Sequence, residues 1–198
     1  KIVEIKSDIK VKSTLFNLNP DNKTILIIGG SLGALTINKA IGNGLEMFKQ
    51  NNLNVIWQTG ESFSKKANQL INETNTRGIT THSFIKNIET AYNLADIIVS
   101  RAGAIAISEL CVVGKPVILI PSPNVAENHQ FKNAQSLVNK NAAILVKDTQ
   151  ANNKLVKEIV DLKNNPILMN QLSKNIKTME YKNASNVISS HALNLIKQ

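Results

Sequence analysis

The sequence predicts an α/β protein with a Rossmann-like open parallel sheet of six strands and helices on both faces. Short runs rich in Ile, Leu and Val alternate with segments whose apolar residues recur at helical spacing. The runs are apolar throughout, which is typical of strands that helices cover on both faces. Polar or glycine-rich turns follow several of these runs and lead directly into a helical segment, as in sheets that bind ligands at their edge.

Apolar runs and helical spacing locate the expected elements. Strands are expected at residues 24–28, 54–58, 79–84, 96–99, 117–120 and 143–146. Helices are expected at residues 34–50, 62–73, 87–94, 104–113, 127–139, 152–163, 166–179 and 183–196. Right-handed crossovers would place the loops after the strands along one edge of the sheet, where ligands bind in folds of this type.

The polar residues that precede the first strand suggest a connecting segment. Residues 1–23 are rich in Lys and Asn and close with the turn signal Asn19-Pro20-Asp21-Asn22. We expect them to contain one helical stretch and to join a Rossmann-like domain that spans residues 24–198. The sequence opens without a Met, which favours a piece of a longer protein.

Charge, aromatic content and cysteine content exclude several classes of function. The net charge of +9 favours anionic partners, but the lysines are scattered and aromatic residues make up 4% of the chain, so we expect no nucleic-acid binding. The single cysteine, Cys111, excludes an internal disulfide and fits a reducing compartment. No apolar run is long enough to cross a membrane, and no group of residues has the spacing of a metal site.

The turn Gly29-Gly30-Ser31-Leu32-Gly33 joins the first strand to the first helix. Glycines allow close approach of the backbone to a ligand, and a helix N-terminus offers N–H groups and partial positive charge. The spacing matches neither the dinucleotide pattern G-x-G-x-x-G nor a Walker A loop. The motif predicts a phosphate loop, with a tight turn that binds no ligand as the alternative.

The turn after the fourth strand, beginning at Ser100, predicts a second anion site. Arg101 and Gly103 lie at the start of the following helix, where an arginine beside free N–H groups suits a diphosphate. Glu109 follows eight residues after Arg101, and its carboxylate can accept hydrogen bonds from a vicinal diol such as that of ribose. The alternative for Glu109 is an acid that is simply favoured near a helix N-terminus.

A polar helix start after the fifth strand adds a third candidate. Gln130 can donate to and accept from sugar hydroxyls, or it can belong to an ordinary polar helix face. His129 is a possible base or sugar contact, with a surface histidine as the alternative.

Together these segments resemble the MurG family of lipid-intermediate N-acetylglucosaminyltransferases, from about residue 24 to residue 146. The resemblance covers the glycine motif 29–34, Phe84-Ile85 with Tyr92, and the signature region 100–109 followed by Gly114-Lys115-Pro116. It continues in His129-Gln130 with Asn133-Ala134. Leu32 departs from the pattern, because many members have Gln at this position.

The resemblance implies the C-terminal, donor-binding domain of an inverting GT-B glycosyltransferase that uses UDP-GlcNAc without a required metal or other cofactor. The position eight residues before Glu109 agrees with an inverting enzyme, because retaining members often have Glu where this chain has Arg101. The family's acceptor site and catalytic base belong to an N-terminal domain that this chain does not match, so no catalytic residue is expected here. A lipid-linked acceptor and peripheral association with the cytoplasmic face of the bacterial plasma membrane are implied as well.

Residue roles follow from the same resemblance. Ile85 would hold uracil through its backbone, Glu109 the ribose, Ser31 the diphosphate and Gln130 the GlcNAc hydroxyls. The remaining implied donor contacts are Arg101, Gly103, Ala104, Ile105, Ala106, Ile107 and Ser108, with Gly29, Gly30 and Gly33 as the phosphate loop.

Two other functions share this sequence pattern. Another GT-B nucleotide-sugar enzyme, such as a UDP-GlcNAc 2-epimerase, would need acidic residues near the sugar C2, and Glu127 is the local candidate. A non-enzymatic nucleotide-binding or interaction domain is the second alternative.

Overall fold

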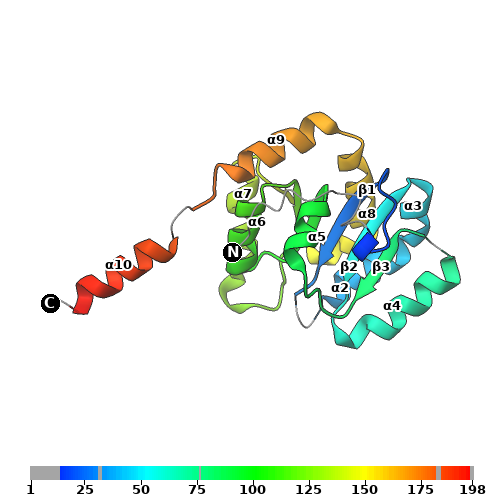
Figure 1. Cartoon of the computed structure of the whole chain (residues 1–198), viewed down its shortest axis with the longest axis horizontal. Helices are drawn as coiled ribbons and strands as arrows, with labels where there is room; N and C mark the ends of the chain where they lie inside the picture. Colours follow the sequence, from blue (N-terminus) through cyan, green and yellow to red (C-terminus); the bar gives the residue numbers. More distant parts are fainter. Residues whose placement is uncertain (1–13, 31–32, 76, 182–183, 197–198) are drawn as a thin grey trace.

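The computed structural model of this chain describes residues 14–30, 33–75, 77–181 and 184–196. Six parallel strands form one sheet in the order β3-β2-β1-β4-β5-β6, with helices on both faces (Figure 1). The strands are β1 (Lys23–Ile28), β2 (Leu53–Gln58), β3 (Ile79–His82), β4 (Ile97–Ser100), β5 (Val117–Leu119) and β6 (Ile144–Leu145). The predicted fold class is confirmed, and the strand order reverses between β1 and β4, where such sheets bind ligands.

Helices follow each strand, and the last three come after β6. They are α2 (Leu35–Asn43), α3 (Leu45–Gln50), α4 (Glu61–Thr74), α5 (Ile88–Leu94), α6 (Ala104–Val113), α7 (His129–Val138), α8 (Ala151–Lys163), α9 (Pro166–Lys177) and α10 (Ala184–Ile196). Two short 3₁₀ turns, η1 (Ala126–Asn128) and η2 (Asp148–Gln150), precede α7 and α8.

Alternate residues of the strands build a separate core on each face of the sheet. In β1, Ile25 and Ile27 point toward the core that α2, α3, α4 and α8 cover, whereas Leu26 points toward the core under α5, α6 and α7. All three side chains are fully buried. Burial of an aliphatic side chain stabilises the fold by roughly 1.5–3 kcal/mol, so apolar runs of this kind hold the carboxyl ends of the strands rigidly in place.

Some predicted boundaries were wrong. The single helix expected at 34–50 is two helices, because Gly44 ends α2 and begins α3. A Cβ atom at this position would lie 2.4 Å from the side chain of Val156, so α8 packs directly against the break. β3 ends at His82 rather than at residue 84. The helix expected from residue 127 starts as a 3₁₀ turn whose Glu127 and Asn128 have φ near +50°.

The two ends of the described chain differ in their packing. Phe16 and Leu18 are buried in the second core, so the residues just before β1 pack onto the domain. At the other end, α9 contributes Leu172 to the first core and Ile176 to the second. α10 lies away from the body of the domain (Figure 1). No helix among the described residues is long and apolar enough to cross a membrane.

Candidate functional site

A pocket of about 520 Å³ lies at the carboxyl ends of β1, β4 and β5. It contains several of the residues predicted from the sequence, together with residues that the sequence pattern did not single out. Its lining consists of Gly29, Gly30, Gly33, Ala34, Leu35, Thr36, Arg101, Ser122, Pro123, Asn124, Gln130 and Asp148. The phosphate loop, Arg101 and Gln130 therefore meet in one place, although Gly29 and Gln130 are 101 residues apart in sequence.

The phosphate loop rests against the end of β2. Gly33 has a φ of +77°, and a Cβ atom there would lie 2.2 Å from the carbonyl oxygen of Thr59, so only glycine fits. The same carbonyl oxygen accepts a hydrogen bond from Asn38 Nδ2 (2.7 Å), and Asn38 Oδ1 accepts one from Trp57 Nε1 (2.9 Å). A buried polar network thus fixes the wall behind the loop. Ser31, the predicted diphosphate contact, lies outside the described residues, as does Leu32.

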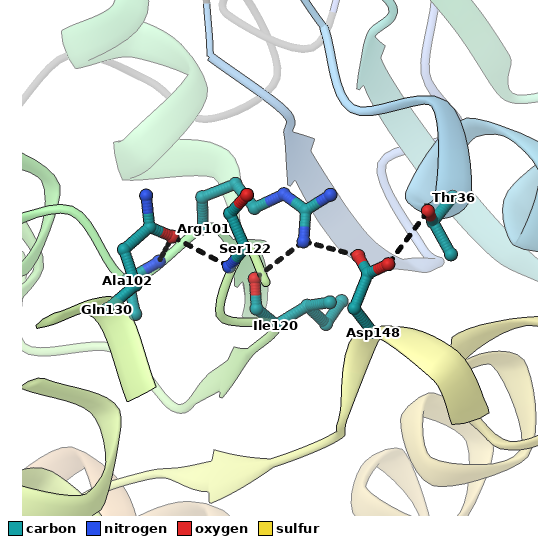
Figure 2. A network of polar contacts seen from close by, with 7 residues as sticks. All are labelled: Thr36, Arg101, Ala102, Ile120, Ser122, Gln130 and Asp148. Carbon is teal, nitrogen blue, oxygen red and sulfur yellow. Dashed lines mark hydrogen bonds and ion pairs between the residues drawn. The ribbon is translucent and has the colours of Figure 1, made fainter. Parts of the chain in front are cut away.

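Arg101 is held by two acceptors at the edge of the pocket (Figure 2). Its Nη1 donates to the carbonyl oxygen of Ile120 (3.1 Å) and to Oδ1 of Asp148 (2.5 Å). Asp148 Oδ2 in turn accepts from the hydroxyl of Thr36 (2.9 Å), at the start of α2. Both charged side chains are more than four-fifths buried, so this ion pair is only weakly screened by solvent. The guanidinium retains further N–H groups for a ligand.

The start of α6 offers unused backbone donors. Gly103 caps the helix with extended backbone angles and no side chain accepts a hydrogen bond there. The first N–H groups of a helix have no partner within the helix, and they point toward whatever lies beyond its N-terminus. A Cβ atom on Gly103 would meet no protein atom within 4 Å. Nothing in the described protein therefore requires a glycine at this position.

The first turns of α6 are exposed in part. Ala104, Ile105 and Ser108 are exposed, and Ala106 and Ile107 are half-buried. The hydroxyl of Ser108 donates to the carbonyl oxygen of Ala104 (3.0 Å), so its proton is used within the helix.

Glu109 has a buried tyrosine as its partner. The Tyr92 hydroxyl, from α5, donates to Glu109 Oε2 (3.1 Å). Burial and then the neighbouring Glu109 charge raise the pKa of the Tyr92 hydroxyl, so it remains a proton donor. Glu109 itself is exposed, and this contact leaves Oε1 for another donor.

Ile85 lies in the loop after β3 and is buried. Its backbone N–H donates to Gln58 Oε1 (3.2 Å), and Gln58 Nε2 donates to the carbonyl oxygen of Gly30 (3.0 Å). Neither Ile85 nor Glu109 lines the pocket that contains Arg101 and Gln130. The predicted residues thus form two groups, and Gln58 joins the loop of one group to the loop of the other.

Gln130 is oriented by the backbone around it (Figure 2). Its Oε1 accepts from the N–H groups of Ser122 (2.9 Å) and Ala102 (3.3 Å). Because the oxygen end must face both donors, the Nε2 end faces the other way and can donate to a ligand. His129 is exposed and contacts the carbonyl oxygen of Ala126 (2.9 Å) through Nδ1.

Three residues that support the site were not selected as site residues from the sequence: Thr36, Gln58 and Asp148. The position at a strand end could have identified two of them. Gln58 ends β2 and Asp148 closely follows β6, at the edge of the sheet where ligands bind. Within the described ranges, no group of three or more His, Cys, Asp or Glu residues could hold a metal ion.

Sequence comparison identifies relatives along most of this chain. Residues 24–188 match the model of the glycosyltransferase family 28 C-terminal domain. The chain is 44% identical over 181 residues to the UDP-N-acetylglucosamine--N-acetylmuramyl-(pentapeptide) pyrophosphoryl-undecaprenol N-acetylglucosamine transferase of Phocaeicola vulgatus, covering 91% of this chain and 48% of the relative. It is also 44% identical over 195 residues to the transferase of the same name in Cytophaga hutchinsonii, covering 98% and 52%. The chain therefore spans about half the length of these curated relatives.

Solved structures share the fold. MurG of Acinetobacter baumannii superposes with a TM-score of 0.77 at 24% identity, covering 94% of this chain and 52% of that one. The UDP-GlcNAc 2-epimerase of Neisseria meningitidis bound to UDP-GlcNAc superposes with a TM-score of 0.64 at 17% identity, covering 93% and 48%. With the family model matched from β1 into α10, this chain belongs to the glycosyltransferase family 28 C-terminal domain family, and its sheet is that of a GT-B glycosyltransferase.

Proposed function

We propose that this chain is the donor-binding half of an inverting glycosyltransferase that transfers GlcNAc from UDP-GlcNAc to a lipid-linked MurNAc-pentapeptide in peptidoglycan synthesis. The names of the Phocaeicola and Cytophaga relatives support this reaction. The observation that carries the proposal is the pocket in which the glycine loop, Arg101 and Gln130 meet. This pocket has the donors that a sugar diphosphate requires.

The diphosphate would lie between the glycine loop and the N-terminus of α6. Backbone N–H groups at Gly103 to Ala106 and the N–H groups of Arg101 that neither Ile120 nor Asp148 uses would stabilise its negative charge. The same donors would stabilise the UDP that leaves when the acceptor attacks C1 of the sugar. Ser31 would add a hydroxyl contact from the loop.

The nucleoside and the sugar would lie on opposite sides of the diphosphate. Uracil would contact the backbone of Ile85, and the ribose hydroxyls would donate to Glu109, which Tyr92 holds in place. Gln130 would donate from Nε2 to a GlcNAc hydroxyl, because backbone N–H groups already occupy its oxygen. These roles need no cofactor.

The catalytic base and the acceptor site would belong to the other half of the enzyme. The relatives' names specify an acceptor attached to undecaprenol, so we infer that the enzyme works at a membrane surface. The resemblance to the MurG family implies that this surface is the cytoplasmic face of the bacterial plasma membrane. The net charge of +9 favours such a surface when it carries anionic lipids.

Calorimetry of this chain with UDP, UDP-GlcNAc, GDP and NAD tests the donor role. We expect binding of UDP and UDP-GlcNAc and weaker or absent binding of GDP and NAD. A preference for NAD or GDP contradicts the proposal.

In the intact enzyme, UDP release that requires the lipid-linked acceptor supports transfer, whereas inversion at the sugar C2 without acceptor indicates an epimerase. Nucleotide binding with neither reaction indicates a binding domain.

A further inference from the structure

Gln58 joins the two groups of site residues. It is the last residue of β2, the strand beside β1 on one side and β3 on the other. From there its side chain reaches Gly30 in the loop after β1 and Ile85 in the loop after β3. Its partners are 28 and 27 residues away in sequence, and the residue is 4% exposed.

Each end of the amide has one backbone partner. Nε2 donates to the Gly30 carbonyl oxygen (3.0 Å), and Oε1 accepts from the Ile85 N–H (3.2 Å). Only a side chain with a donor and an acceptor at its tip can make both contacts. Because the amide is rigid and buried, it sets the spacing between the two loops. Breaking the contact with Ile85 would leave a buried backbone N–H group without this acceptor, whereas the Gly30 carbonyl oxygen also accepts from the N–H group of Gly33 (3.0 Å).

We propose that Gln58 is a positioning residue for the donor, which holds the diphosphate loop and the base loop at the separation that one nucleoside diphosphate spans. This inference rests on the proposed function, because it takes Gly30 as part of the phosphate loop and Ile85 as the base contact. Gln58 itself need not touch the ligand. Its effect is to make the two parts of UDP fit at the same time.

Gln58→Met tests this role in the 198-residue chain. The thioether keeps the length of the side chain and removes both hydrogen bonds. We expect about a tenfold loss of UDP affinity by calorimetry, the size of one to two hydrogen bonds. The affinities for uridine alone and for inorganic pyrophosphate alone, measured by NMR titration, should change by less than about twofold, because separate pieces do not depend on the spacing between loops.

A purely structural role gives a different pattern. A loss of stability would weaken the binding of UDP, uridine and pyrophosphate alike, or it would unfold the chain. Circular dichroism at the titration temperature detects unfolding. Gln69→Met is the matched control, because Gln69 is exposed on α4 and contacts only Glu73 among the described hydrogen bonds. It should leave UDP affinity unchanged.

Gln58→Glu provides a second variant. A protonated carboxyl at this position can donate to Gly30 and accept from Ile85, whereas a carboxylate faces the Gly30 oxygen with like charge. Burial raises the pKa of an introduced acid, so UDP affinity relative to the parent should recover between about pH 8 and about pH 5.5. Burial lowers the pKa of His82, the register partner of Gln58 on β3, and the parent is measured at both pH values to account for this neighbour.

The outcomes separate the two proposals. A parent chain that does not bind UDP overturns the proposed function and this inference together. A parent that binds UDP while folded Gln58→Met binds it equally well overturns the inference alone. Equal losses for UDP, uridine and pyrophosphate, or no recovery of Gln58→Glu at low pH, also overturn it.

Discussion

The loop after β1 and the corner after β4 both bring glycines to a helix start, but for different reasons. At Gly33 the protein itself requires glycine, because the Thr59 carbonyl oxygen occupies the space of a side chain. At Gly103 the space is open and φ is −67°, an angle that any residue adopts. The first region is constrained by folding. The second leaves room that a ligand can fill.

The largest expected effect is on stability, at Gly33. Gly33→Ala should lower the free energy of unfolding by about 3 kcal/mol, since the alanine combines an unfavourable positive φ with a clash against Thr59. Urea unfolding followed by circular dichroism measures this. A loss below about 0.5 kcal/mol would show that the loop relaxes easily, and the contrast with Gly103 would disappear.

Removal of the predicted ribose contact tests the corner as a ligand site. Glu109→Ala should weaken UDP binding by about 1–3 kcal/mol in calorimetry, which is the contribution expected of charge-assisted hydrogen bonds. Stability should fall by about 1 kcal/mol, because the buried Tyr92 hydroxyl loses its acceptor, so circular dichroism must show that the variant is folded during the titration. Equal UDP affinity in the variant and the parent would remove the ribose role.

Gly103→Ala tests the open space at the start of α6. Its free energy of unfolding should stay within about 0.5 kcal/mol of the parent, because loss of a glycine cap and reduced freedom of the unfolded chain offset each other. UDP affinity should fall about tenfold if the diphosphate approaches the start of α6 closely, since the new Cβ points into that space. Unchanged affinity would place the ligand elsewhere.

The smallest expected effect concerns the partner of Glu109. Tyr92→Phe removes the hydrogen bond to Oε2 and should weaken UDP binding by about 0.5–1 kcal/mol. In the background of Glu109→Ala the same substitution should have no further effect on UDP affinity. Additive losses in the double variant would mean that Tyr92 acts on the ligand by another route.

The sequence predicts the framework of this site better than its contacts. The expected helix 104–113 matches α6, and all six apolar runs are strands, because burial and backbone hydrogen bonding leave a strong local pattern. The break at Gly44 was missed, and the side chain that requires glycine there, Val156, belongs to α8, which is far away in the sequence. The left-handed residues Glu127 and Asn128 were missed because their sequence also suits a regular helix start.

Local sequence patterns were therefore enough to predict the fold class, the family and the loops that line the candidate site. Tertiary packing selects which polar groups meet. It paired Arg101 with Asp148, which is 47 residues away, and it placed Gln58 between Gly30 and Ile85. Local patterns report burial and hydrogen bonds within a few residues, whereas these contacts depend on the order in which the strands lie side by side. The strand order brings the distant loops together, and the buried side chains between them then have one set of partners.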